Sequence, residues 1–413
     1  MTALIVRLSW TLLIAPLLPA LVDLVPSLRA RARRRPLRRP YTPSPVHDFT
    51  VLVPIYGNIK YLENVDYLSR YGNRVMLCTT RHESDEFFGD LDGIASTHGF
   101  RVERFPVAAR RSCGRRQVCG TIRDRLIQQA TELVESEYVV CIDADTVTQG
   151  PLEDLVGTVR SSGLDLAGVR LVPSNLSRLL GRLQAHEYRM AMRMRRIIPY
   201  ITPGALQIST SRAHRAIMRR HSLFFQGNDA EMGLLGRALG YKVGYLPVEV
   251  PTIVPDNFVA WWRQRFAWAG GEFRIFVVNL PLFRRHPLFM IYGFVFVFMF
   301  VPFKLMEVAP PGRVIGSLLF LYCAAVVAMN WQDRDRALLL YPLYGLFISL
   351  VLAPLGALSY AMQARQSRNP GFVRPRRPLH FRRNRRLRPA TPTGGESMAI
   401  GTVAGGTVAG QPA

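Results

Sequence analysis

Short apolar runs alternate with segments of helical character between residues 46 and 255, and this alternation limits the fold more than any other feature. Strands are predicted at 49–56, 74–79, 102–106, 138–142 and 166–172. Amphipathic segments such as 120–137 lie between them. The pattern predicts an α/β domain around a largely parallel sheet, with ligands bound at the carboxyl ends of its strands.

Positive charge is concentrated in two short runs. The chain has 413 residues and a net charge of +24. Residues 29–39 contain seven arginines and residues 365–388 contain ten, without any acidic residue, so these runs supply 17 of the 24 charges. Each run lies beside an apolar segment, which is typical of contact with anionic membrane lipids. A nucleic-acid-binding body, whose arginines would be spread over the fold, is not expected.

Four segments are apolar over about the 20 residues that a membrane-spanning helix needs: 8–28, 288–309, 313–331 and 337–362. We expect 8–28 to be an uncleaved anchor, with a cleaved signal peptide as the competing interpretation. The arginines after it place the next domain in the cytoplasm and predict a multi-pass protein of the plasma membrane. Three C-terminal crossings would put the second arginine run outside, so the number of crossings stays open.

The same patterns give a division of the chain. We predict an N-terminal transmembrane anchor (1–28), a basic cytoplasmic linker (29–45), an α/β domain (46–256), an amphipathic interfacial segment (257–284), transmembrane helices (285–362) and a basic, then low-complexity tail (363–413). The interfacial segment mixes tryptophan, phenylalanine and arginine, a composition that suits a helix lying among lipid headgroups.

The strongest chemical signal is a D-x-D triplet. Asp143 and Asp145 directly follow the apolar run 138–142, so both carboxylates are expected at the end of a strand. Two hard carboxylates one residue apart can hold a divalent cation against a diphosphate. Acidic residues in a turn with a purely structural role are the alternative.

Two further motifs follow the triplet. In 227–231 (GNDAE), Asp229 could take a proton from an attacking hydroxyl, or the acids could simply favour the start of a helix. In 262–268 (WRQRFAW), the guanidinium groups can clamp phosphates and Trp268 offers a flat apolar wall. The alternative for this segment is an aromatic belt at the membrane surface.

The order of these motifs between apolar segments resembles the membrane-embedded family 2 glycosyltransferases, which include the hyaluronan, chitin and cellulose synthases. The resemblance covers roughly residues 49–275 and implies a GT-A-like fold. Two further elements are similar to family motifs: 53–56 (VPIY) and 114–118 (GRRQV). The resemblance implies that donor-binding residues are Tyr56, Arg115, Arg116, Asp143, Gln264, Arg265 and Trp268.

By the same likeness, Asp229 is the catalytic base, and Asp145 with Asp143 binds Mg²⁺ or Mn²⁺. Two departures from the family pattern are visible. Asn228 stands where an acid usually precedes the base, and Ala267 stands where the Q-x-x-R-W motif has its arginine. These departures put processive polymerisation in doubt more than they threaten sugar transfer.

The resemblance therefore implies an inverting, metal-dependent hexosyltransferase. We expect it to move a sugar from a nucleotide-sugar donor, a UDP-sugar by preference, to a hydroxyl of a growing polysaccharide. One alternative is the transfer of a single sugar to a lipid-linked acceptor. Another, from a different class, is a catalytically inactive membrane scaffold.

Overall fold

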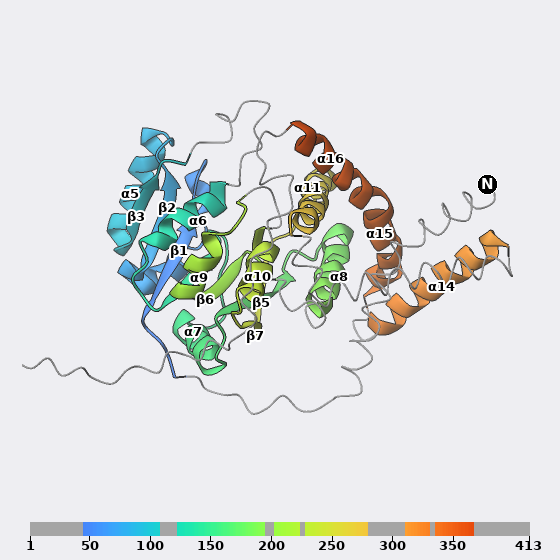
Figure 1. Cartoon of the computed structure of the whole chain (residues 1–413), viewed down its shortest axis with the longest axis horizontal. Helices are drawn as coiled ribbons and strands as arrows, with labels where there is room; N and C mark the ends of the chain where they lie inside the picture. The colour runs from blue at the N-terminus through green and yellow to red at the C-terminus, as the bar shows by residue number, and fades with distance from the viewer. Residues whose placement is uncertain are drawn as a thin grey trace, which may run out of the picture. The chain divides into compact units, whose positions relative to one another are not determined.

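The computed structural model describes residues 44–107, 122–194, 202–223, 228–279, 310–330 and 335–366. Its centre is a seven-stranded sheet in the order β3-β2-β1-β4-β6-β5-β7 (Figure 1). The strands are β1 (Phe49–Pro54), β2 (Val75–Thr80), β3 (Arg101–Phe105), β4 (Tyr138–Ile142), β5 (Leu166–Pro173), β6 (Leu206–Thr210) and β7 (Val243–Thr252).

The five strands predicted from the apolar runs are all present, and β4 has the predicted bounds. The sheet is mixed, because β6 runs antiparallel to both β4 and β5 while the other pairs are parallel. Sequence patterns missed β6 and β7. Polar Gln207 and Ser209 are buried in β6, and β7 contains Pro247 and Pro251. Proline argues against a central strand, but β7 lies at the edge of the sheet, where proline is tolerated.

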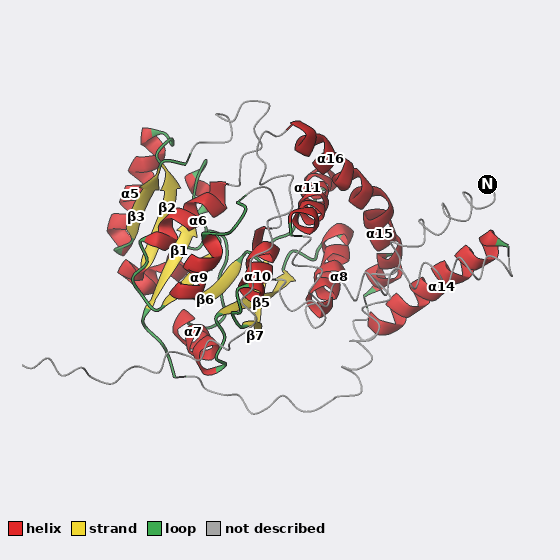
Figure 2. Ribbon diagram, in the orientation of Figure 1, coloured by secondary structure: helices red, strands yellow, loops and turns green. Residues whose placement is uncertain are grey.

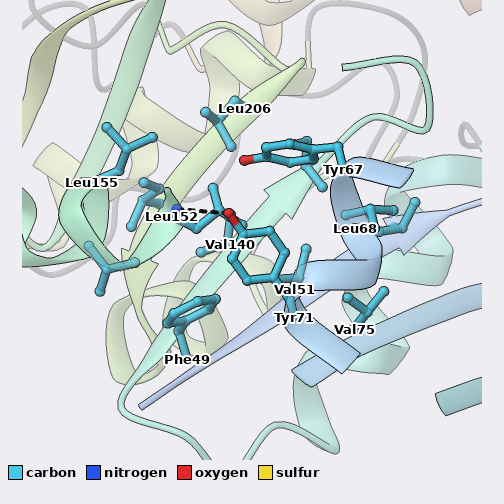
Figure 3. Close-up of a cluster of buried hydrophobic side chains, with 14 of the residues drawn as sticks. Phe49, Val51, Tyr67, Leu68, Tyr71, Val75, Val140, Leu152, Leu155 and Leu206 are labelled. Carbon is cyan, nitrogen blue, oxygen red and sulfur yellow. Dashed lines mark hydrogen bonds between the residues drawn. The ribbon is translucent and has the colours of Figure 1, made fainter. Parts of the chain in front are cut away.

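A buried cluster on one side of the sheet fixes the position of β1 and β4. It includes the labelled side chains of Figure 3: Phe49, Val51, Tyr67, Leu68, Tyr71, Val75, Val140, Leu152, Leu155 and Leu206. The Tyr71 hydroxyl accepts a hydrogen bond of 3.0 Å from the backbone N–H of Leu152, which satisfies a polar group inside the cluster. Every residue of β1 and β4 is buried, as expected for central strands covered on both faces.

Helices cover the sheet and place its loops. They are α4 (Val65–Leu68), α5 (Asp85–His98), α6 (Ile122–Glu132), α7 (Leu152–Ser161), α9 (Ser211–Met218) and α10 (Asn228–Ala238), with 3₁₀ turns η2 (Ile59–Tyr61) and η3 (Ser69–Arg74). The ends of α5 follow from its sequence. The Ser84 side chain accepts from the N–H of Phe87 at its start, and Gly99 with a φ of 70° ends it.

The remaining helices form a second group beside the sheet (Figure 2). They are α8 (Leu179–Met194), α11 (Phe258–Val278), α14 (Pro311–Asn330), η6 (Arg336–Leu339), α15 (Tyr341–Phe347), the π-helical turn η7 (Ile348–Leu352) and α16 (Ala353–Gln366). The predicted interfacial segment corresponds to α11, whose Asn257 cap accepts from the N–H of Ala260. One face of α11 is buried in protein, since Trp261 and Arg265 are nearly inaccessible.

No helix within the described ranges combines the length and the apolar character that crossing a bilayer requires. The crossings predicted at 313–331 and 337–362 are therefore not supported. The first falls in α14, and the second is divided among η6, α15, η7 and α16, because a polar start and a π-helical turn interrupt the apolar run. The segments 8–28 and 288–309 and the arginine runs at 29–39 and from 367 onward lie outside the described residues.

Candidate active site

The D-x-D triplet forms a turn at the carboxyl end of β4, and Asn64 holds this turn in place. The buried Asn64 side chain donates to the carbonyl oxygens of Asp143 (3.0 Å) and Thr146 (2.7 Å). The backbone N–H groups of Glu63 and Asn64 both donate to the carbonyl of Ala144. The two carboxylates thus project from a rigid loop, as predicted. Asn64 itself was missed, because nothing in its local sequence links it to a segment 79 residues away.

Arg123, the second residue of α6, binds the first carboxylate of the triplet. Its Nε donates to Asp143 Oδ1 at 2.7 Å, and another guanidinium nitrogen donates to the carbonyl of Gly204 at 2.6 Å. A third contact reaches Asp124 at 3.1 Å. Burial alone lowers the pKa of Arg123, but the charges of Asp143 and Asp124 outweigh it and raise the pKa. Arg123 is a permanent cation at the strand ends that the sequence analysis did not identify.

The backbone of Gly204 connects the D-x-D triplet to the predicted base, Asp229. Its N–H donates to Asp229 Oδ2 at 3.0 Å, while its carbonyl accepts from Arg123. Asp229 Oδ1 accepts from the N–H of Ala230, and Thr202 Oγ1 donates to the Asp229 carbonyl at 2.6 Å. The backbone N–H of Asp143 in turn donates to the carbonyl of Ala205. Residues 202–205 therefore bring together two motifs that lie more than eighty residues apart in the chain.

Burial raises the pKa of both Asp143 and Asp229. For Asp143 the charge of Arg123 opposes the rise, and for Asp229 the N–H of Ala230 and the charge of Arg123 oppose it. Both side chains still reach solvent, so water screens part of the effect. A carboxylate that is more basic than an ordinary aspartate, yet accessible, suits proton abstraction.

Asp145 is the exposed member of the triplet. Its carboxylate has a hydrogen bond of 3.2 Å from the Thr146 hydroxyl, which leaves oxygen lone pairs directed to solvent. The described residues contain no group of three or more His, Cys, Asp or Glu side chains that could hold a metal. Asp145 with Asp143 still fits Mg²⁺ or Mn²⁺, since such ions commonly bind one or two carboxylates and take their other ligands from phosphate and water.

The other predicted donor residues have different outcomes. Tyr56 follows β1 and is half-buried at the same edge of the sheet as Asp143, because β1 and β4 are parallel neighbours. Arg115 and Arg116 lie outside the described residues. Gln264 and Trp268 lie on α11, where the Gln264 side-chain oxygen accepts from Arg265.

Arg265 contacts a carboxylate of the protein. Its guanidinium donates to both oxygens of Glu187 at 2.8–3.0 Å and to Gln184 at 3.1 Å. It also lies over the Trp268 ring, 4.3 Å from the ring centre. The Tyr344 hydroxyl donates to Glu187 at 2.5 Å. Binding of Arg265 to a donor phosphate stays a prediction. The structure shows a contact between Arg265 and Glu187 that the sequence did not indicate.

Glu272, one turn beyond Trp268, was also missed. Burial raises the pKa of Glu272 to about 7, with the charges of Glu187 and Asp229 acting in the same direction and that of Arg265 against them. Its side chain reaches solvent, so water screens part of this rise. Glu272 lies on α11 two residues before Arg274, which contacts Glu231 of α10, the helix that carries Asp229.

Glu231, the last residue of the GNDAE motif, has a structural position. It is fully buried, and Ser222 and Asn279 donate to its carboxylate. Arg274 of α11 lies 3.7 Å from the same carboxylate. This buried group fastens α10, which carries Asp229, to α11.

A family model described as glycosyl transferase family group 2 matches residues 138–332, a range that includes both Asp143 and Asp229. A search of curated protein sequences gave no significant match.

Solved structures give a similar result. A mannosyltransferase from Pyrobaculum calidifontis, solved with GDP-Man and Mn²⁺, aligns with a TM-score of 0.53 at 16% identity, over 85% of this chain and 99% of that chain. TarS from S. aureus, solved with UDP, aligns with a TM-score of 0.35 at 13% identity, over 76% of this chain and 91% of that chain. The family model matches residues 138–332 of this chain, and the likeness to the mannosyltransferase shows a mixed α/β fold of the kind found in GT-A glycosyltransferases.

Proposed function

We propose that this chain is an inverting, metal-dependent glycosyltransferase that moves a hexose from a nucleotide-sugar donor to an acceptor hydroxyl. The observation that carries the proposal is the position of Gly204. Its carbonyl accepts from Arg123, which also binds Asp143, and its N–H donates to Asp229. A cation-binding carboxylate and an accessible, basic carboxylate beside one cationic side chain are what a diphosphate leaving group and an attacking hydroxyl require.

In this proposal Asp145, with Asp143, would hold Mg²⁺ or Mn²⁺. The bound ion would neutralise charge that develops on the departing diphosphate. The mannosyltransferase was solved with GDP-Man and Mn²⁺ and TarS with UDP, which supports a nucleoside-diphosphate sugar as the donor class. Tyr56, at the same edge of the sheet, is in position to contact the nucleotide.

Asp229 takes the proton from the acceptor hydroxyl as its oxygen attacks the anomeric carbon. The bond from that carbon to the diphosphate oxygen breaks, and its electron pair leaves with the diphosphate. Attack from the opposite face inverts the anomeric configuration. The N–H groups of Gly204 and Ala230 fix both Asp229 oxygens, so the free lone pairs of the carboxylate keep one direction.

Release of nucleoside diphosphate from a panel of UDP- and GDP-sugars, with and without Mn²⁺, tests the function directly. Asp145→Asn should abolish the metal-stimulated release. Asp92→Asn is the matched control, since Asp92 is an exposed carboxylate paired with Arg104 of the edge strand β3, which two strands separate from β4. Equal release by wild type and Asp145→Asn would contradict the metal assignment. Chain-length analysis of the product separates a polysaccharide acceptor from single transfer to a lipid-linked acceptor.

We also propose that the enzyme acts at the cytoplasmic face of the plasma membrane. Large apolar side chains are exposed on α14, α15 and α16, among them Phe320, Leu343, Leu358 and Met362. The arginine runs 29–39 and 365–388 add an attraction to anionic headgroups. Flotation of the full chain with vesicles tests this proposal. Binding to anionic and not to neutral vesicles is expected, and no flotation with either would contradict it.

A further inference from the structure

The Glu187 carboxylate on α8 joins three helices. It accepts hydrogen bonds from Arg265 of α11 at 2.8–3.0 Å and from the Tyr344 hydroxyl of α15 at 2.5 Å. Trp261 of α11 donates its indole N–H to the same Tyr344 hydroxyl at 2.8 Å. Gln184, one turn before Glu187, accepts from Arg265 as well. Both charges of the pair are thereby satisfied within the protein.

The Glu187–Arg265 pair sets the environment of Trp268. The Arg265 guanidinium lies over the Trp268 ring at 4.3 Å, and the Tyr188 ring, next to Glu187 in the chain, lies 6.3 Å from the Trp268 ring. A guanidinium held by a carboxylate keeps a fixed plane, and a fixed plane limits the rotamers of the indole that stacks on it. The position of Trp268 therefore depends on a carboxylate of another helix, α8.

The helix that Glu187 holds is also connected to the helix of the proposed base. Glu231 of α10, two residues after Asp229, lies 3.7 Å from Arg274 of α11 and accepts a hydrogen bond from Asn279 at the end of α11. Trp268 and Arg274 lie on the same helix, so the segment that Glu187 holds belongs to the helix to which α10, with Asp229, is fastened. Glu187 is the acid of an ion pair in this arrangement, because Arg265 donates to both of its oxygens and Tyr344 donates to one of them.

We propose that Glu187 is a positioning residue for glycosyl transfer, acting through Arg265 to hold Trp268 and the surrounding turn of α11 beside Asp229. The inference rests on the proposed function, and it adds a dependence on α8 and α15. In this proposal Arg265 is the partner of Glu187 and not a ligand of the donor phosphate, so Glu187 should affect turnover of the bound substrate more than binding of the nucleotide.

A double-mutant cycle in the full chain tests the proposal. Glu187→Gln should lower kcat by about 10²-fold, the scale for small misplacement of a reacting group, with little change in donor KM. In a Trp268→Ala background the same substitution should cost almost nothing more, because it acts through Trp268. Glu132→Gln, which breaks the exposed bidentate pair with Arg219, is the matched control and should leave kcat unchanged. Equal costs of Glu187→Gln in both backgrounds would overturn the proposal.

A ligand-free measurement separates this inference from the proposed function. Acrylamide quenching of Trp268, obtained by difference from Trp268→Phe, should increase in Glu187→Gln and, more weakly, in Tyr344→Phe. Tyr344→Phe keeps the Glu187–Arg265 ion pair, so it provides the measurement if Glu187→Gln does not fold. Unchanged quenching in Tyr344→Phe and in any folded Glu187 variant would refute the positioning role. A wild type that releases no nucleotide, yet shows the quenching change, would refute only the proposed function.

Discussion

Two carboxylates near the ends of this site, Asp229 on α10 and Glu187 on α8, have opposite surroundings. Asp229 accepts two backbone hydrogen bonds, has no cationic hydrogen-bond partner among the residues that the structure describes, and is partly exposed. Glu187 is bound by a guanidinium that donates to both of its oxygens and by a phenol that donates to one. Both are acids at the edge of the sheet domain, but of the two only Glu187 is neutralised by a direct ion pair.

The difference separates chemistry from placement. Burial raises the pKa of the Asp229 carboxylate, so its ionised form destabilises the folded state, but the same shift makes it a better proton acceptor. A carboxylate neutralised by arginine has neither effect, and its contribution is to orient the groups around it. The following predictions test this comparison.

Asp229→Asn should give the largest effect. Loss of a general base costs about 10²–10⁴-fold in kcat. The substituted side chain keeps the size of aspartate and can still accept from one of the two backbone N–H groups, so folding should be preserved. Rates of nucleotide release and a thermal unfolding curve measure both properties. Unchanged sugar transfer by Asp229→Asn would show that another group is the base.

Arg123→Lys should lower kcat by about 10²-fold, because lysine keeps the charge but cannot reach Asp143, Asp124 and the Gly204 carbonyl at once. Arg215→Lys is a matched control, since Arg215 donates to the Val134 carbonyl away from the strand ends. Full activity of Arg123→Lys would show that the Arg123 guanidinium does not link Asp143 and Asp229 in catalysis.

Asn64→Ala should act mainly on stability. The substitution removes the side-chain donors to the Asp143 and Thr146 carbonyls and leaves buried acceptors unpaired, at a cost of about 1–3 kcal/mol. Urea unfolding measures this loss. A smaller decrease in metal-stimulated activity is expected with it, because the triplet turn loosens. A variant as stable as wild type would show that backbone contacts alone hold the turn.

The smallest expected effect is a pH dependence of stability. Burial raises the pKa of Asp229 in the folded state, so its contribution favours folding at acid pH and is lost as pH rises through the folded pKa. The Tm of Asp229→Asn relative to that of wild type should therefore rise as the pH increases from below the unfolded aspartate pKa of about 3.9 to neutral pH. Thermal melts of both proteins from pH 3 to pH 8 measure the difference. A Tm difference that stays constant or falls over this range would contradict the assigned sign.

Local sequence determined the strands and the chemistry at their ends. All-apolar runs such as 138–142 specify central strands of a covered sheet, and the residues directly after them must project at its carboxyl edge. That reasoning located Asp143 and Asp145, whereas Tyr56 was indicated by the family resemblance alone. Proline in β7 and buried polar side chains in β6 hid the other two strands, since their stability comes from edge position and neighbouring strands.

Only the tertiary structure decided the partners. Arg123 donates a hydrogen bond to the carbonyl of Gly204, which is 81 residues away in the chain. Arg265 donates to Glu187, which is 78 residues away. A hydrogen bond requires a partner within about 3 Å, and no local pattern encodes which distant segment packing will bring there. The sequence therefore specified which side chains could do the chemistry, and the packing of α6, α8 and α11 specified which of them are free to do it.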